Sequence, residues 1–244
     1  MTTMTAPSPA SRFDTPAALL GITLPVAMTW AYLYGTQGTL TGILYSVSRI
    51  IEFVLPGIWI WVILKQPFKL MTPTRNGTGL GILFGLLVSA AMFVLYFGFL
   101  RDAPVFAETP QLLQTMLADF NITTLWAFLA FAAFITIFNS SLEEYFWRWF
   151  VFGRLNASKG VKTAVLLSSL GFALHHILIL NMFIPPEFFW SATLVFSFLI
   201  AIGGAVWCWL TYKTGSVFAA WISHVIIDAA AMLIGLDMLL PVLS

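Results

Sequence analysis

The chain has 244 residues, of which 60% are hydrophobic and only 9% are charged. Soluble domains average about 45–50% apolar and about 25% charged residues, so a soluble globular domain is excluded. The formal net charge of +1 also argues against a nucleic-acid partner, because such binding needs many Lys and Arg on one exposed face. The composition therefore predicts a polytopic membrane protein whose main partner is the lipid bilayer.

Residues 1–14 are rich in Thr, Pro and Ser, and they are too poor in apolar residues to fold or insert. We expect a disordered cytoplasmic tail there, followed by a single membrane domain over residues 15–244. Apolar windows of about 20 residues, long enough to cross a hydrocarbon core of about 30 Å, recur along that domain. They cover residues 15–36, 43–64, 78–100, 123–155, 162–182, 188–212 and 216–236. The prediction is an all-α bundle of about seven transmembrane helices, of which the fourth is too long for a simple crossing.

If the seven windows cross the membrane in turn, most Lys and Arg residues lie on the same side of the membrane as the N-terminus. Nine of the eleven basic residues lie there: Arg12, Lys65, Lys69, Arg75, Arg148, Arg154, Lys159, Lys162 and Lys213. Because loops rich in Lys and Arg stay in the cytoplasm, we expect a cytoplasmic N-terminus and a multi-pass protein of a bacterial inner membrane. Arg49 lies within the second window, and Glu52 follows at a spacing that predicts a structural ion pair.

Ionisable residues inside the predicted spans form three clusters. They are Glu143, Glu144 and Arg148 in the fourth span, His175 and His176 in the fifth, and His224 and Asp228 in the seventh. Inserting each such residue into the membrane costs at least a few kcal/mol, so each is expected to have a partner or a functional role. If the fourth helix continues to about residue 155, the helical rise brings the three clusters to a similar depth, about 14–21 Å from the inner end. We therefore expect the clusters to meet.

Helical spacing distinguishes the neighbours within each cluster. Glu144 and Arg148 are four residues apart and share a face, so we expect them to pair. Glu143 lies about 100° around the helix and remains free for chemistry. His175 and His176 diverge by the same angle, so we expect His176 to face the site and His175 to pack beside it.

A carboxylate beside an imidazole can take a proton from water and return it to a leaving group, which predicts general acid–base hydrolysis. His224 and Asp228 could bind the developing oxyanion, or Asp228 could fix the tautomer of His224. Two His and one Glu also suit zinc, so Glu143, His176 and His224 are the alternative metal ligands. We expect no cofactor, because the chain has no HExxH pattern. The Trp and Phe residues are expected mainly at the membrane interface and facing lipid.

The clusters resemble the CAAX-protease and bacteriocin-processing (CPBP, Abi-like) family of intramembrane endopeptidases. The matching patterns are EExxxR at Glu143, Glu144 and Arg148, FxxxH at Phe172 and His176, and HxxxN/D at His224 and Asp228. The resemblance covers about residues 123–236, which we take as the catalytic core.

The resemblance implies water activation by Glu143 and His176, an oxyanion side formed by His224 and Asp228, and support from Glu144, Arg148 and Phe172. The eukaryotic prenyl-protein proteases have Asn at the position of Asp228, whereas many bacterial-type relatives have Asp. Asp donates no hydrogen bond unless it is protonated, which favours an orienting role for Asp228 toward His224.

We therefore expect an intramembrane endopeptidase that cuts near the C-terminus of a membrane-anchored protein or peptide, lipidated or not. The alternative is a non-enzymatic protein, either a proton-coupled carrier or an immunity or scaffold protein, that retains the polar cluster. A continuous polar path to the outer side would distinguish the carrier.

Overall fold

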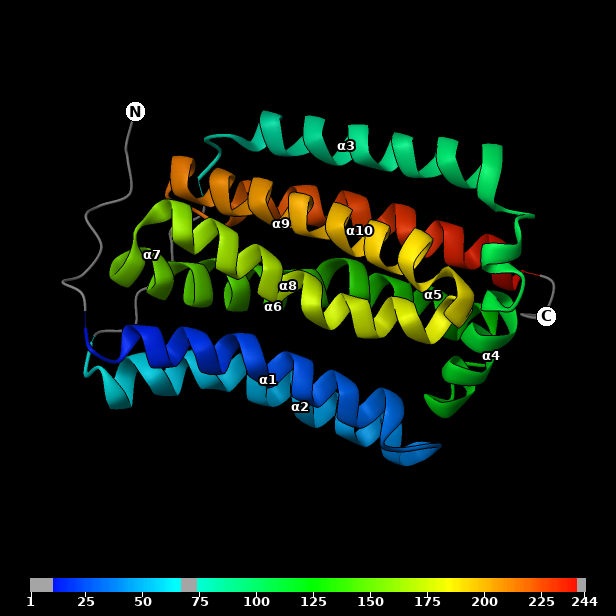
Figure 1. Cartoon of the computed structure of the whole chain (residues 1–244), viewed down its shortest axis with the longest axis horizontal. Helices are drawn as coiled ribbons and strands as arrows, with labels where there is room; N and C mark the ends of the chain where they lie inside the picture. The colour runs from blue at the N-terminus through cyan, green and yellow to red at the C-terminus, as the bar shows by residue number, and fades with distance from the viewer. Residues whose placement is uncertain (1–10, 67–73, 241–244) are drawn as a thin grey trace.

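A computed structural model describes residues 11–66 and 74–240, and all regular secondary structure in these ranges is helical (Figure 1). The α-helices are α1 (Asp14–Tyr34), α2 (Thr39–Ile58), α3 (Thr78–Leu95), α4 (Thr109–Asp119), α5 (Leu125–Ala133), α6 (Ser140–Glu143), α7 (Gly153–Lys159), α8 (Val161–Phe183), α9 (Leu194–Thr214) and α10 (Phe218–Leu239). The π-helical segments are η1 (Trp59–Ile63), η2 (Tyr96–Leu100), η4 (Phe134–Asn139), η5 (Glu144–Phe152) and η7 (Phe189–Thr193). Two short 3₁₀ turns complete the set, η3 (Pro104–Phe106) and η6 (Pro186–Phe188). Residues 1–10 of the predicted tail and Lys69 lie outside the described residues.

Within the described residues, seven helical segments are long and apolar enough to cross a membrane. They are Asp14–Tyr34, Thr39–Ile63, Thr78–Leu100, Leu125–Lys159, Val161–Phe183, Pro186–Thr214 and Phe218–Leu239. Each coincides with a predicted apolar window to within a few residues, so the prediction of an all-α polytopic bundle is confirmed. The cytoplasmic position of the N-terminus stays a prediction.

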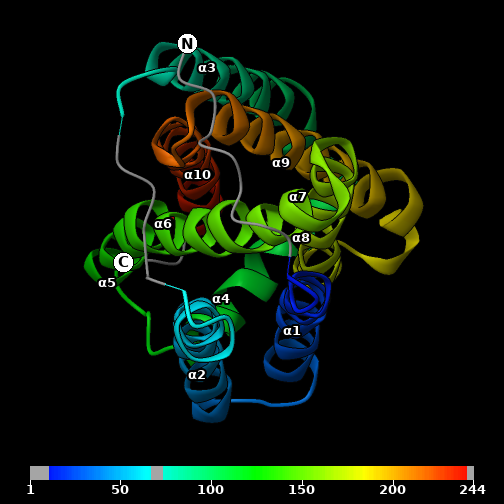
Figure 2. The same cartoon turned by 90° about the vertical axis from the view of Figure 1, so that its left-hand side faces the viewer.

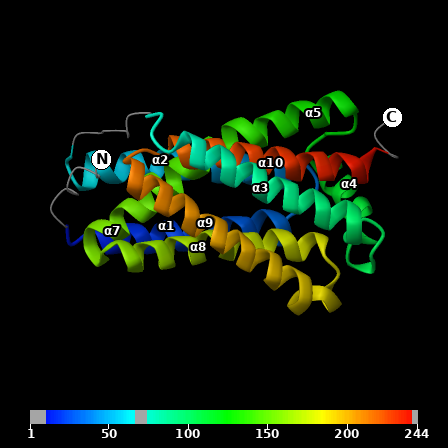
Figure 3. The ribbon, with the colours of Figure 1, turned by 90° about the horizontal axis from the view of Figure 1, so that it is seen from above.

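The fourth span occupies the middle of the bundle, with α1 and α2 on one side and α3 on the opposite side (Figures 1 and 2). Helix α8 packs against both α1 and α9, and α10 packs against α3 and α9. Seen from above, α9 runs obliquely across α8 (Figure 3). The polar residues of the fourth span therefore have helices around them rather than lipid alone.

The fourth span is helical without a break from Leu125 to Lys159, so the predicted continuation through Arg148 is confirmed. Its centre is wound as a π-helix over η5, where an extra residue per turn changes the direction in which successive side chains point. The apolar core is formed around this segment, and Phe146, Trp147 and Phe150 are almost fully buried there. The π-helical turns thus lie where the chain places its acidic pair.

Helix α3 approaches α10 closely because small residues line its contact face. A Cβ atom at Gly81 would collide with the backbone carbonyl of Ala219, and one at Gly85 would lie 3.0 Å from Cβ of Ile226. The hydroxyl of Ser89 donates to the carbonyl oxygen of Ile226 at 3.1 Å. Small residues at a spacing of four let two membrane helices pack backbone to backbone, which fixes α10 along its length.

Candidate active site

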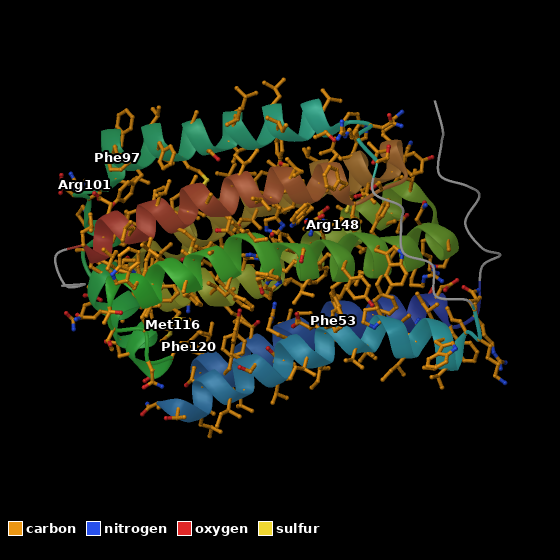
Figure 4. The ribbon with its side chains drawn as sticks, turned by 180° about the vertical axis from the view of Figure 1, so that it is seen from behind. Phe53, Phe97, Arg101, Met116, Phe120 and Arg148 are labelled. Atoms are coloured by element: carbon orange, nitrogen blue, oxygen red, sulfur yellow. The ribbon has the colours of Figure 1, made fainter. Side chains whose placement is uncertain are left out.

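The polar clusters predicted from the sequence come together where three helical segments meet. Glu143 ends α6 and Glu144 begins η5, whereas His176 lies on α8 and His224 on α10. Arg148, on η5, lies away from both ends of the bundle (Figure 4). All of these residues are inside candidate membrane spans.

His224 is the centre of the site, because three carboxylates surround its imidazole ring. Its Nδ1 atom is 2.9 Å from Oε1 of Glu144. Its Nε2 atom is 3.5 Å from Oδ1 of Asp228 and 3.7 Å from Oε2 of Glu143. An ionised carboxylate only accepts hydrogen bonds, so the Nδ1–H of His224 donates to Glu144 and the Nε2 side faces the other two acids.

The Oε1 atom of Glu144 is committed to buried partners. Its Oε1 atom lies 3.1 Å from Nη1 of Arg148, as the helical spacing predicts, and both side chains are almost completely buried. The guanidinium carbon of Arg148 lies 4.3 Å from the ring centre of Phe172 and 4.8 Å from that of Trp207. Cation–π contacts partly replace the hydration that the buried guanidinium loses. Glu144 therefore holds Arg148 and His224 at once.

Glu143 presents its two carboxylate oxygens to different surroundings. Its Oε1 atom accepts a hydrogen bond from Nδ2 of Asn139 at 3.0 Å and lies 3.6 Å from Nη1 of Arg49. Its Oε2 atom faces Nε2 of His224. One oxygen of Glu143 is thus held, while the other is directed into the site.

His176 has a defined tautomer. Its Nδ1 atom lies 2.8 Å from the carbonyl oxygen of Phe172, which can only accept, so Nδ1–H donates and Nε2 is left to accept a proton. The ring centre of Phe172 lies 4.6 Å from that of His176 and 6.1 Å from that of His224. His175 is buried and stacks on Trp147, with ring centres 5.6 Å apart. The assignment of His176 to the site and of His175 to packing stays a prediction.

Asp228 and Glu144 contact opposite nitrogens of His224. The sequence favours an orienting role for Asp228, which lies four residues along the same helix. In the structure the shorter contact, at Nδ1, comes from Glu144, and Asp228 lies at Nε2 with its side chain 21% exposed. His176 and Asp228 are only partly buried, whereas His224 is 3% exposed. His176 and Asp228 are thus the more exposed of the predicted site residues.

Three residues contact the site although the sequence did not predict them as part of it. Trp207 stacks on His224 with ring centres 4.2 Å apart, and its indole N–H donates to the hydroxyl of Ser223. Trp207 is therefore an exception to the expectation that the Trp residues lie mainly at the interface or face lipid. Asn139 and Arg49 contact Glu143, and only the position of Asn139, four residues before Glu143, gave a signal in the sequence.

Zinc bound by Glu143, His176 and His224 is the alternative that the sequence predicts for this site. Among residues 11–66 and 74–240, no three His, Cys, Asp or Glu side chains are grouped so that they could hold a metal ion. Nδ1 of His224 is occupied by Glu144, which leaves Nε2 as the nitrogen that could bind a metal. Zinc at Glu143, His176 and His224 stays the alternative prediction.

Comparison with known proteins identifies one family. A family model described as type II CAAX prenyl endopeptidase Rce1-like matches residues 124–230. The matched stretch includes all the residues of the EExxxR, FxxxH and HxxxN/D patterns, and it agrees with the resemblance derived from the sequence. Neither a curated protein nor a solved structure matches the chain.

Proposed function

We propose, on the premise that residues 124–230 match the family model described as type II CAAX prenyl endopeptidase Rce1-like, that the protein is an intramembrane endopeptidase that uses an activated water. The proposed substrate is a membrane-anchored protein or peptide that is cut near its C-terminus. We place the enzyme in a bacterial inner membrane with its N-terminus in the cytoplasm, in keeping with the distribution of Lys and Arg. The family match favours this function over a carrier or an immunity or scaffold protein.

The proposed mechanism rests on the different contacts of two adjacent acids, Glu143 and Glu144. Glu144 is tied to Arg148 and His224, whereas Glu143 directs one oxygen into the site. Glu143 is thus the acid that can exchange a proton during a reaction, and Nε2 of His176 offers a second proton acceptor nearby.

In the first proposed step, a water molecule at Glu143 and His176 loses a proton to the Glu143 carboxylate. The water oxygen forms a bond to the carbonyl carbon of the substrate, and the electron pair of the C=O bond moves onto the carbonyl oxygen. The oxyanion so formed lies on the side of His224, whose Nε2–H stabilises it when the ring is protonated. Asp228 stabilises that imidazolium.

In the second step, the C=O bond re-forms and the C–N bond breaks. The proton held by Glu143 passes to the departing nitrogen, so the products are a carboxylic acid and an amine and Glu143 is again a carboxylate. Both steps use groups that the described residues supply, and we propose that no resident metal ion takes part.

The test compares the C-termini of membrane proteins in cells that make the wild type or a Glu143→Gln variant. Mass spectrometry is expected to find at least one membrane protein whose C-terminus is shortened by the wild type and intact with the variant. Glu108→Gln is the matched control, because Glu108 lies between the third and fourth spans. Identical C-termini with the wild type and Glu143→Gln would overturn the proposed function.

A further inference from the structure

Arg49 is a buried cation that lies outside the matched domain and yet reaches the site. It belongs to α2, and its side chain is only 12% exposed. Its Nη2 atom lies 2.9 Å from Oε1 of Glu52, one turn further along the same helix. Its Nη1 atom points across to the fourth span, 3.6 Å from Oε1 of Glu143. One guanidinium therefore connects an acid of its own helix to the acid proposed for catalysis.

Asn139 completes the connection between the two helices. Nη1 of Arg49 donates to Oδ1 of Asn139 at 3.4 Å, and Nδ2 of Asn139 donates to Oε1 of Glu143 at 3.0 Å. Nη1 of Arg49 also lies 3.6 Å from Oε1 of Glu143, the oxygen that Asn139 contacts, so this oxygen is approached from two directions. The remaining oxygen, Oε2, is the one that faces His224. The contacts on Oε1 thus determine where Oε2 points.

A simple role for Arg49 is the neutralisation of Glu52 within the membrane. The pair at a spacing of three would need only the contact between Nη2 and Oε1 for this purpose. The second arm of the guanidinium is directed instead at Asn139 and Glu143, and the guanidinium also lies 5.4 Å from the ring centre of Tyr45. Glu52 and Tyr45 hold the cation from α2 while Nη1 serves the fourth span.

We infer that Arg49, acting with Asn139, is a positioning residue that fixes the carboxylate of Glu143 with one oxygen held and the other directed at the reacting water. This inference rests on the proposed function, because it assigns a role in the same reaction. It also assigns a part of the site to α2, which the match over residues 124–230 does not include.

The experiment removes Arg49 and Glu52 together, so that neither leaves an unpaired charge behind. The variant is Arg49→Met/Glu52→Gln, assayed in liposomes on a membrane-anchored peptide that the wild type cleaves. The matched control is Arg154→Met/Asp14→Asn, which removes another largely buried Arg–carboxylate pair, 3.3 Å apart, at one end of the bundle. Folding of each variant is checked by its thermal unfolding and by its elution in detergent.

We expect the Arg49→Met/Glu52→Gln variant to fold, its kcat to fall by about 10- to 100-fold and its KM to stay within about twofold of wild type. A loss of structure alone would lower the active fraction and the unfolding temperature together. A folded double variant whose kcat equals that of the control would overturn the inference. The Arg49–Glu52 pair would then serve only to neutralise two charges inside the membrane.

Arg49→Lys decides the matter if the double variant does not fold. It keeps the positive charge, but a single ammonium group cannot serve Glu52 and Asn139 in two directions. We expect a folded protein whose kcat is reduced several-fold at unchanged KM, and a wild-type kcat would overturn the inference. Glu143→Gln is run in the same assay to separate the two proposals. If the Glu143→Gln variant still cleaves the peptide, the proposed function is contradicted. If Glu143→Gln abolishes cleavage and the Arg49 variants cleave at the wild-type rate, only the role of Arg49 is contradicted.

Discussion

Nδ1 of His224 lies 2.9 Å from Oε1 of Glu144, although 80 residues separate the two in the chain. The same oxygen of Glu144 lies 3.1 Å from Nη1 of Arg148. One carboxylate therefore neutralises a buried cation and fixes the orientation of an imidazole on another helix. This relationship separates the roles of the two adjacent acids, because it leaves Glu143 as the one directed into the site.

The first prediction concerns this separation of roles. Glu144→Ala should lower the yield of folded protein and its activity together, because removing one member of a buried pair leaves Arg148 uncompensated and costs about 3–5 kcal/mol. Glu143→Gln should keep the yield and abolish the activity, since it keeps the shape and the hydrogen-bonding capacity while removing the proton acceptor. Purified amounts and cleavage rates are the measurements. Equal yields for both variants, with activity lost only for Glu144→Ala, would show that the catalytic acid is wrongly assigned.

The second prediction concerns Trp207, which stacks on His224 and lies against Arg148. Trp207→Ala should destabilise the protein by about 3–5 kcal/mol, as other large-to-small core changes do, and should lower kcat because the imidazole loses its support. Trp209→Ala is the control, since Trp209 is two residues away on α9 and 44% exposed. Thermal unfolding in detergent and the cleavage rate measure both effects. Equal losses for the two variants would contradict a specific role for Trp207.

The third prediction concerns the packing of α3 on α10. Gly81→Leu should lower the stability by about 1–3 kcal/mol or more, because its side chain would collide with the backbone at Ala219. Gly79→Leu, two residues earlier, should have little effect, since a Cβ atom there meets no heavy atom within 4 Å. The unfolding temperatures of the two variants decide the question. A Gly81→Leu protein as stable as Gly79→Leu would mean that α3 does not support α10 in this way.

The fourth prediction concerns metal dependence. Active protein treated with a chelator should keep its activity, because the proposed steps use only side chains and water. Elemental analysis should find well below one zinc per chain, for which about three ligands would have to converge. Close to one zinc per chain, with activity lost on its removal and restored on its addition, would replace the metal-free mechanism and leave the site residues unchanged.

The sequence by itself determined the membrane fold and the members of the main polar clusters. The seven spans follow from composition, because a hydrocarbon core of about 30 Å demands about 20 apolar residues in each crossing helix. Glu143, Glu144, His176, His224 and Asp228 were identifiable because an ionisable residue inside such a span is costly and needs a partner. The pair of Glu144 and Arg148 was also predictable, since residues four apart on a helix share a face.

The tertiary structure alone decided which partner each polar atom has. The chemistry of Asp favoured Asp228 as the residue that orients His224, whereas Glu144 from the fourth span makes the shorter contact. Trp207 and Arg49 joined the site from α9 and α2 without any pattern in the sequence that connects them to it. The physical reason is that helical periodicity determines neighbours within one helix, whereas contacts between helices depend on how each helix is rotated, wound and packed against the next.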